Sequence, residues 1–169
     1  MTFEFRCATC DEIHTGMPTF GASAPLSYYC IPQEERATRC QLGSDDCVID
    51  GREFYVRGCI EIPVHGAEES FAWGVWVSLS EASYEQWRQC FHEAHRSDVG
   101  PFFGWLNAAL QPYPDTVNLK TYVHLLDHGI RPYIELEPTD YPLAVEQRNG
   151  ISAERLAEIY AMMIHGKDE

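Results

Sequence analysis

The sequence lacks several features by which common protein classes are recognised. It has no Gly-rich phosphate loop, no nucleophile elbow and no dinucleotide-binding fingerprint. It also lacks a hydrophobic run long enough to cross a bilayer, and residues 1–6 have neither the basic start nor the apolar stretch of a signal peptide. These absences count against familiar enzyme classes, and we expect a cytoplasmic protein.

Positive charge is also scarce. Twelve Lys and Arg residues face 26 Asp and Glu residues, which gives a formal net charge of −14, and no basic run is longer than two. A field of this sign repels nucleic acids and anionic membranes, so we expect neither as a direct partner. It would steer a basic protein toward the surface, although such acidity can also serve solubility alone.

The seven cysteines form an odd-numbered set spread through apolar segments. In a chain without an export signal, this usage predicts free or metal-bound thiols and not a disulfide framework. The length of 169 residues and the hydrophobic content of 45% suit one domain over 1–169. We expect a metal-anchored segment at 1–30, where glycines and prolines are frequent, and a folded body at 31–169.

Residue periodicity predicts the architecture of that body. Segments 3–6, 47–49, 53–64, 71–79, 117–126 and 130–136 are typical of strands, and turns at Asp50-Gly51 and His128-Gly129 join two pairs. Helices are expected after Pro32, from a capping box at Ser83, after Asp140 and after Ser152. The sequence therefore predicts an α+β fold with a mainly antiparallel sheet of about five to six strands and three to four helices.

The clearest chemical motif lies near the amino terminus. Cys7 and Cys10 can hold one ion from a single turn, and His14 follows four positions later. This spacing predicts a structural zinc in a knuckle-like turn, with Cys47 as the preferred fourth ligand. The other thiols considered for that place are Cys30, Cys40 and Cys59.

Other uses of this motif stay open at this point. The two thiols could be unligated and buried, or redox-active, although Asp11 and Glu12 disfavour a reactive thiolate. Water could also take the fourth place, which would make the site catalytic.

A second group of polar residues falls in the last two predicted strands and the loop after them. Lys120 and His124 share one strand face, Glu135 and Glu137 share another, and Asp140 follows. If the faces coincide, a carboxylate could orient His124 in a pocket for acid–base chemistry. The alternative is a set of cross-strand ion pairs on a solvated face.

Two further patterns carry little chemical information. His92 and His95 are spaced i, i+3 and not i, i+4, so a solvated or capping role is favoured over a metal site. Arg57 lies inside an apolar strand, and we expect a structural salt bridge there.

Short blocks of residues also come in a characteristic order along nearly the whole chain. They are Cys7-x-x-Cys10-x-x-x-His14, Asp46-Cys47-Val48-Ile49-Asp50, Val56-Arg57-Gly58, Glu61-Ile62-Pro63-Val64, Trp73-Gly74-Val75-Trp76-Val77-Ser78, Phe103-Gly104-Trp105-Leu106, Leu119-Lys120-Thr121, Leu136-Glu137-Pro138-Thr139-Asp140 and Glu146-Gln147-Arg148-x-Gly150-Ile151.

In this order the blocks resemble the bacterial family called domain of unknown function 2199. The resemblance implies no activity, but it places Cys47 inside a family block. Tyr141 stands where the resemblance leads us to expect histidine, which weakens any catalytic site centred there.

Together these observations predict a small acidic protein with a structural zinc that works as a non-catalytic protein-binding module. An inhibitor or immunity protein is one concrete form. The alternative is an enzyme of unknown class with a pocket around Lys120, His124, Glu137 and Asp140.

Overall fold

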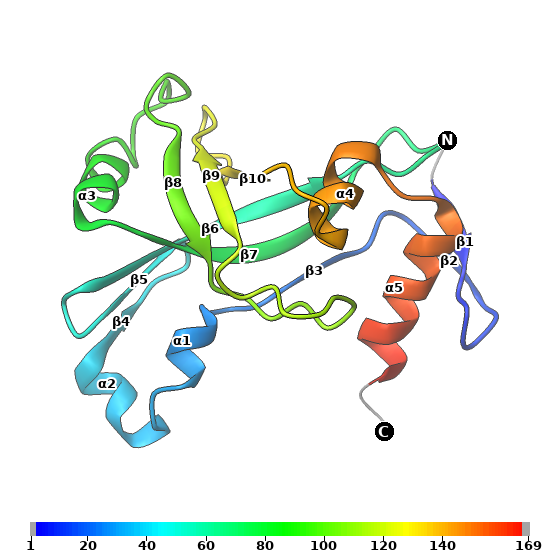
Figure 1. Ribbon diagram of the computed structural model, residues 1–169, viewed down its shortest axis with the longest axis horizontal. Helices are drawn as coiled ribbons and strands as arrows, with labels where there is room; N and C mark the ends of the chain where they lie inside the picture. Colours follow the sequence, from blue (N-terminus) through cyan, green and yellow to red (C-terminus); the bar gives the residue numbers. More distant parts are fainter. Residues whose placement is uncertain (1–2, 167–169) are drawn as a thin grey trace.

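A computed structural model describes residues 3–166, and its main sheet closes on itself over part of its width (Figure 1). The order of this eight-stranded sheet is β3-β7-β8-β9-β10-β6-β5-β4, and β6 also pairs with β7. Strands β6 to β10 therefore form a five-stranded barrel. The strands are β3 (Thr19–Gly21), β4 (Cys40–Leu42), β5 (Asp46–Ile49), β6 (Glu53–Ile62), β7 (Phe71–Leu79), β8 (Phe102–Leu106), β9 (Lys120–His124) and β10 (Tyr133–Leu136).

The helices lie outside the barrel, and two more strands form a separate hairpin. The helical elements are α1 (Leu26–Tyr29), the 3-10 turn η1 (Gln33–Glu35), α2 (Arg36–Arg39), α3 (Glu81–Gln89), α4 (Pro142–Asn149) and α5 (Ala153–His165). The hairpin pairs β1 (Glu4–Arg6) with β2 (Ile13–Thr15). Across the described residues, no helix combines the length and apolar character that a membrane span needs.

The predicted α+β class and mainly antiparallel pairing are confirmed. Within the main sheet of residues 3–166, only β3–β7 and β10–β6 pair in parallel. The element counts exceed the expectation, because ten strands and five α-helices occur in that range. The extra elements are three to five residues long, too short to produce a clear periodic pattern in the sequence.

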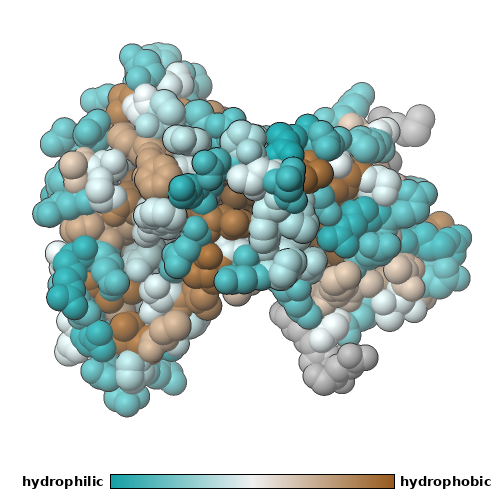
Figure 2. All heavy atoms as spheres, in the orientation of Figure 1, coloured by the Kyte–Doolittle hydropathy of each residue, from teal (hydrophilic) through white to brown (hydrophobic). Residues whose placement is uncertain are grey.

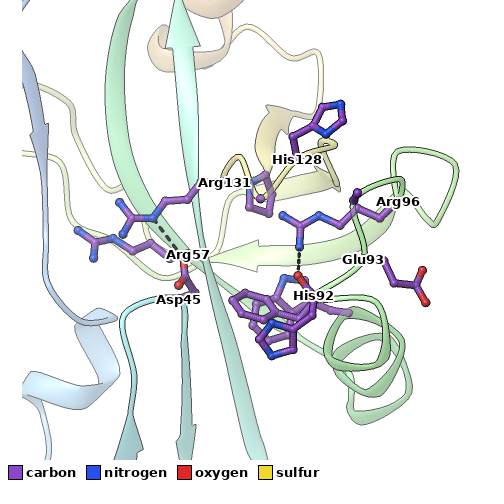
Figure 3. Close-up of a pocket in the computed structure, with 12 residues that line it drawn as sticks. Asp45, Arg57, His92, Glu93, Arg96, His128 and Arg131 are labelled. Atoms are coloured by element: carbon purple, nitrogen blue, oxygen red, sulfur yellow. Dashed lines mark hydrogen bonds and ion pairs between the residues drawn. The ribbon is translucent and has the colours of Figure 1, made fainter.

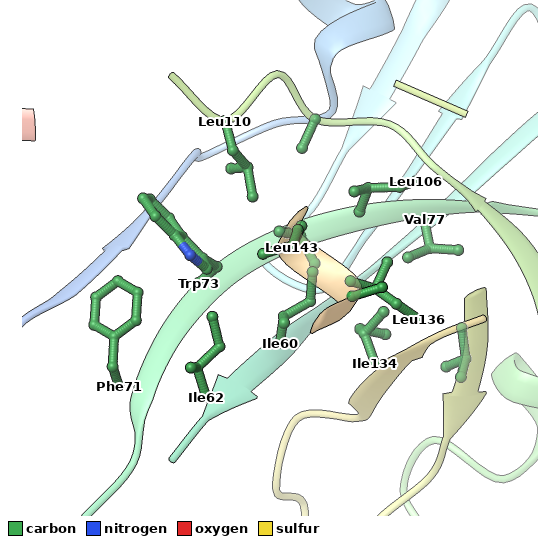
Figure 4. Packing of buried hydrophobic residues seen from close by; sticks show 14 of the residues in the cluster. Ile60, Ile62, Phe71, Trp73, Val77, Leu106, Leu110, Ile134, Leu136 and Leu143 are labelled. Atoms are coloured by element: carbon green, nitrogen blue, oxygen red, sulfur yellow. The ribbon is translucent and has the colours of Figure 1, made fainter. Parts of the chain in front are cut away.

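The interior of the barrel is built by alternation along its long strands. On β7, Phe71, Trp73, Val75 and Val77 are fully buried and face the same core (Figure 4). Ile60 and Ile62 of β6 and Leu143 of α4 are fully buried in the same cluster. The period-two pattern of residues 71–79 therefore predicted this strand correctly.

Part of the outer surface of the barrel, around Trp76, is covered by other segments. Trp76 points outward, yet it is fully buried in a second cluster with Cys47, Ile49 and Tyr55. Tyr28 of α1 packs against this cluster, and the Trp76 indole donates a hydrogen bond of 3.0 Å to the Ala22 carbonyl. At Trp73 and Trp76, β7 is therefore covered on both faces.

Helix boundaries were only partly predictable. Ser152 caps α5 as expected, since its hydroxyl accepts a hydrogen bond from the Arg155 amide. The predicted capping box at Ser83 is wrong: Ser80 caps α3 and accepts a hydrogen bond from the Ser83 amide. Asp140 does not cap α4, whose N-cap is Tyr141 without a side-chain hydrogen bond.

The amino-terminal segment is bound into the fold more closely than its glycines and prolines suggested. Strand β3 adds an edge to the main sheet beside β7, with Phe20 opposite Trp73. The β1–β2 hairpin packs on α5, so the first strand and the last helix lie side by side (Figure 1). The metal-anchored segment expected at 1–30 therefore contains three short strands and the helix α1.

Candidate metal site

The β1–β2 hairpin presents two thiols from its turn. Phe5 pairs with His14 across the hairpin, and the Cys7 amide donates a hydrogen bond of 2.9 Å to the Glu12 carbonyl. Asp11 has a φ of 59°, a left-handed conformation that closes the turn. Cys7 is buried, while Cys10 is exposed at the turn. The spacing of the two cysteines thus puts both thiols on one tight loop, as predicted.

An aromatic contact fixes this hairpin against α5. Phe5 is 5% exposed, and its ring centroid lies 5.2 Å from that of Tyr160. The His14 ring centroid lies 4.5 Å from the same tyrosine ring. The hairpin therefore has an apolar anchor in the core. This finding corrects the expectation that metal alone would hold the segment.

The same packing brings a histidine from the far end of the chain to the thiols. His165 ends α5, and one of its ring nitrogens, Cys7 Sγ and Cys10 Sγ all lie within 4.8 Å of one another. The His165 Nε2 is buried and has no hydrogen-bond partner among the described residues. A buried imidazole nitrogen without a partner is costly, and a bound metal ion would satisfy it.

His14 approaches Cys10 from the other side. Its Nε2 lies 3.7 Å from Cys10 Sγ, and the Tyr160 hydroxyl lies 3.5 Å from its Nδ1. For zinc bonds of about 2.3 Å to sulfur and about 2.1 Å to nitrogen, tetrahedral geometry places the two ligand atoms about 3.6 Å apart. The Cys10–His14 separation fits this ligand-to-ligand distance, and the Tyr160 hydroxyl could accept a hydrogen bond from the other ring nitrogen, as a second partner does at most metal-bound histidines. Cys10, Glu12 and His14 also form a second group of possible ligands.

The two thiols differ in their ionisation. Burial works to raise the pKa of Cys7, but hydrogen bonds from the Cys10 and Thr9 amides outweigh it, and the pKa is lowered. At Cys10 a hydrogen bond from the Glu12 backbone works to lower the pKa. Desolvation by burial and the neighbouring Cys7 outweigh it, so the pKa of Cys10 is raised. The turn therefore favours a thiolate at Cys7.

The structure does not bring Cys47 to this group. Cys47 is on β5, buried in the cluster with Trp76, at the opposite end of the molecule from the hairpin (Figure 1). Burial raises the pKa of its thiol to about 12, which keeps it protonated. Cys40 packs against the same cluster, and Cys30 is the exposed C-cap of α1. The residue that the structure brings to Cys7 and Cys10 is instead His165, which sequence reasoning missed.

One signal in the sequence pointed toward His165 without identifying it. The stripe of Leu156, Ile159, Tyr160 and Met163 predicted that one face of the last helix is buried. No local pattern, however, links that face to a hairpin about 150 residues earlier in the chain. The contact depends on tertiary packing alone.

The residues of the alternative pocket do not converge. His124 Nε2 lies 3.3 Å from Glu135 Oε1, a cross-strand pair on the partly exposed outer face of the barrel. Lys120 and Glu137 line a separate hollow of about 30 Å³, and neither His124 nor Asp140 contributes to it. Such a volume holds about one water molecule and no substrate.

The comparisons with known proteins identify a family but no activity. The sequence model of the family described as an uncharacterized protein conserved in bacteria (DUF2199) matches residues 6–151. The matched part contains Cys7, Cys10 and His14 and ends before α5, which carries His165. No curated protein and no solved structure matches the chain. Since the match covers most of its length, the chain belongs to the bacterial DUF2199 family.

Proposed function

We propose that this protein is a non-catalytic binding module whose two ends are joined by one structural zinc ion. The proposed ligands are Cys7, Cys10, His14 and His165. The observation that carries this proposal is the meeting of two turn thiols with a histidine whose Nε2 is buried and unpartnered. Thiolate and imidazole together are the donor set that zinc prefers in proteins.

Four protein donors favour a structural role over a catalytic one. Structural zinc sites are closed by four protein ligands, whereas catalytic sites keep one place for water. His14 lies beside Cys10 but groups with Cys10 and Glu12, separately from Cys7 and His165, so the turn would have to shift for it to close the shell. The ion would then connect the hairpin to the last turn of α5 and add to the contact between Phe5 and Tyr160.

Elemental analysis of the purified protein tests this site. We expect one zinc per chain in the wild type and in the controls Cys30→Ser and Cys47→Ser, whose thiols lie elsewhere. All proteins are washed with the same chelator before analysis. Cys7→Ser and His165→Ala should each retain less than about a tenth of the wild-type zinc, because each removes a ligand. Full zinc in His165→Ala would contradict the proposed shell.

The partner that we propose is a basic protein, and an inhibitor or immunity protein is one form that such a module could take. Two features support this. The net charge of −14 attracts a cationic surface. The outer face of β8 and β9 also leaves three aromatic rings exposed: Phe103, Trp105 and Tyr122 are 43%, 42% and 38% exposed.

These rings form one continuous surface. The Phe103 centroid lies 5.1 Å from that of Trp105 and 6.1 Å from that of Tyr122. Lys120 borders this aromatic face opposite Trp105, and Glu135 borders it opposite Tyr122. Exposed aromatic clusters are typical centres of protein interfaces, and ring faces attract arginine and lysine side chains.

Affinity capture from a bacterial lysate at low salt tests the partner proposal. We expect the wild type to capture a basic protein that Trp105→Ala captures at least about tenfold less, since buried aromatic anchors often contribute 2 kcal/mol or more. Tyr29→Ala is the matched control, because Tyr29 is an exposed aromatic residue on α1, away from this face. Equal capture by wild type and Trp105→Ala would contradict the proposed surface.

A further inference from the structure

The largest cavity described here gathers positive charge in a chain that is otherwise strongly acidic. It has a volume of about 380 Å³, within the range of small-molecule sites. Three arginines line it, Arg57, Arg96 and Arg131, together with the two carboxylate residues Asp45 and Glu93. Three positive and two negative charges give a formal +1 with the lining histidines neutral, against −14 for the chain.

Register places two of these arginines next to each other. Cys59 of β6 lies opposite Tyr133 of β10 in a parallel pair, so Arg57 and Arg131, each two residues earlier, are neighbours on the outer face. Figure 3 shows their side chains beside Asp45, while the carboxylate of Glu93 points away from them. Two guanidinium groups held close together repel each other unless an anion lies between or beside them.

Arg57 lacks the ion pair that its place in an apolar strand predicted. Its guanidinium carbon lies 5.7 Å from the centroid of the Trp76 ring, and Nη1 donates a hydrogen bond of 3.3 Å to the Ser44 carbonyl. Among the described residues no carboxylate oxygen lies within 4.0 Å of this guanidinium. The expected salt bridge is therefore wrong, and the charge of Arg57 is available to a ligand.

The one carboxylate beside the pair is already engaged. Asp45 Oδ1 accepts a hydrogen bond of 3.3 Å from Arg131 Nε, and Oδ2 accepts one of 2.9 Å from the Ser44 hydroxyl. This leaves both terminal nitrogens of Arg131 without a hydrogen bond in the described structure. Arginine uses such terminal nitrogens to bind carboxylate and phosphate groups through two parallel bonds.

A third arginine gives the cavity a rigid positive wall. Arg96 is 2% exposed, and its guanidinium donates hydrogen bonds of 2.8, 3.0 and 2.9 Å to the carbonyls of Leu126, Phe91 and Ile130. These acceptors are neutral, so they hold the side chain in place without cancelling its charge. The positive charge of Arg96 is therefore weakly screened by solvent and acts strongly on the cavity.

The remaining walls are apolar and aromatic. Trp87 of α3, Phe91 and Pro132 line the same cavity, and the Trp87 and Phe91 ring centroids are 4.9 Å apart. A ligand that fits both parts has an anionic group for the arginines and a flat apolar body for these side chains.

We propose that this cavity binds a small organic anion, a carboxylate or phosphate with an aromatic or similarly flat body. Arg57 and Arg131 bind the anionic group, and Trp87 and Phe91 contact the body. This site is separate from the proposed zinc site and from the aromatic face on β8 and β9, so its test is independent of both.

Titration with phenyl phosphate, followed by amide chemical shifts, tests the proposal. We expect saturable shifts at residues 91–96 and 128–132, with a dissociation constant in the millimolar range or below. Arg57→Gln and Arg131→Gln should each weaken binding at least about tenfold, because a hydrogen bond to a charged group contributes about 1.5–3 kcal/mol. Arg52→Gln is the matched control, since Arg52 is an exposed arginine in the turn between β5 and β6, and it should bind within about twofold of the wild type.

Benzyl alcohol, which is close in shape but uncharged, should cause no shifts at the same residues and concentration. If Arg57→Gln does not fold, Arg131→Gln alone tests the proposal. The Arg131 side chain is 43% exposed, so we expect its replacement to leave the barrel folded. Unchanged affinity in Arg131→Gln, or shifts from benzyl alcohol equal to those from phenyl phosphate, would overturn the proposal.

Discussion

Removal of the metal is expected to lower the midpoint of thermal unfolding by roughly 10 °C. A ligand present at about a thousand times its dissociation constant stabilises the folded state by about 4 kcal/mol, and for a chain of this size about 1 kcal/mol corresponds to 2–4 °C. Treatment with a chelator and the Cys7→Ser substitution should have similar effects, since both leave the hairpin attached to α5 through the packing of Phe5 and His14 on Tyr160. Differential scanning calorimetry measures the change.

The controls separate loss of metal from loss of a thiol. Cys30→Ser removes an exposed cysteine at the end of α1 and should unfold at the wild-type temperature, with the same response to chelator. Chelator should cause no further decrease in Cys7→Ser. A wild-type protein whose midpoint is the same with and without chelator would show that no metal stabilises this fold.

The second large effect is expected at Gly104, in the middle of β8. A Cβ atom at this position would lie 2.3 Å from Val77 Cγ1 and 2.6 Å from the Ser78 carbonyl oxygen. Because one of these neighbours is backbone of the adjacent strand, the barrel must deform to admit a methyl group. We expect Gly104→Ala to lower the free energy of unfolding by about 3 kcal/mol, at the upper end of typical overpacking costs.

Gly74→Ala on the neighbouring strand β7 is the matched control. A Cβ there would lie 3.4 Å from Gly21 Cα, an ordinary contact distance, so the loss should be below about 1 kcal/mol. Urea denaturation of the two variants measures the difference. Equal stability of Gly104→Ala and Gly74→Ala would contradict the close approach of β7 and β8.

The sequence was most informative where the structural signal is local. Alternation in residues 71–79 predicted β7 and its two covered faces, and Ser152 was correctly assigned as a cap. Asp50 and Gly51 both have positive φ values, 53° and 66°, as the predicted two-residue turn requires. Each of these features depends on residues within one element or one turn.

The features that were missed depend on contacts between distant segments. Closure of the barrel requires β10 to pair with β6, about 75 residues earlier, and β3 joins β7, about 50 residues later. Parallel pairings of this kind leave no turn signal in the sequence. His165 reaches Cys7 for the same reason, and Arg57 gained an arginine neighbour instead of a carboxylate because β10 lies beside β6.

Cys47 illustrates the limit of motif reasoning. It was preferred as a ligand because it stands at the start of a strand and in a block that resembles the family; Cys47 does lie near the start of β5, within the residues that the family model matches. Neither contains information on where β5 lies relative to the hairpin. The thiol is instead an apolar contact for Trp76 in the second cluster.

X-ray absorption at the zinc edge of the purified protein tests the central claim most directly. In the wild type we expect a first shell of two sulfur atoms at about 2.3 Å and two nitrogen atoms at about 2.0–2.1 Å. A shell of nitrogen and oxygen only, or one with four sulfur atoms, would contradict the proposed ligands.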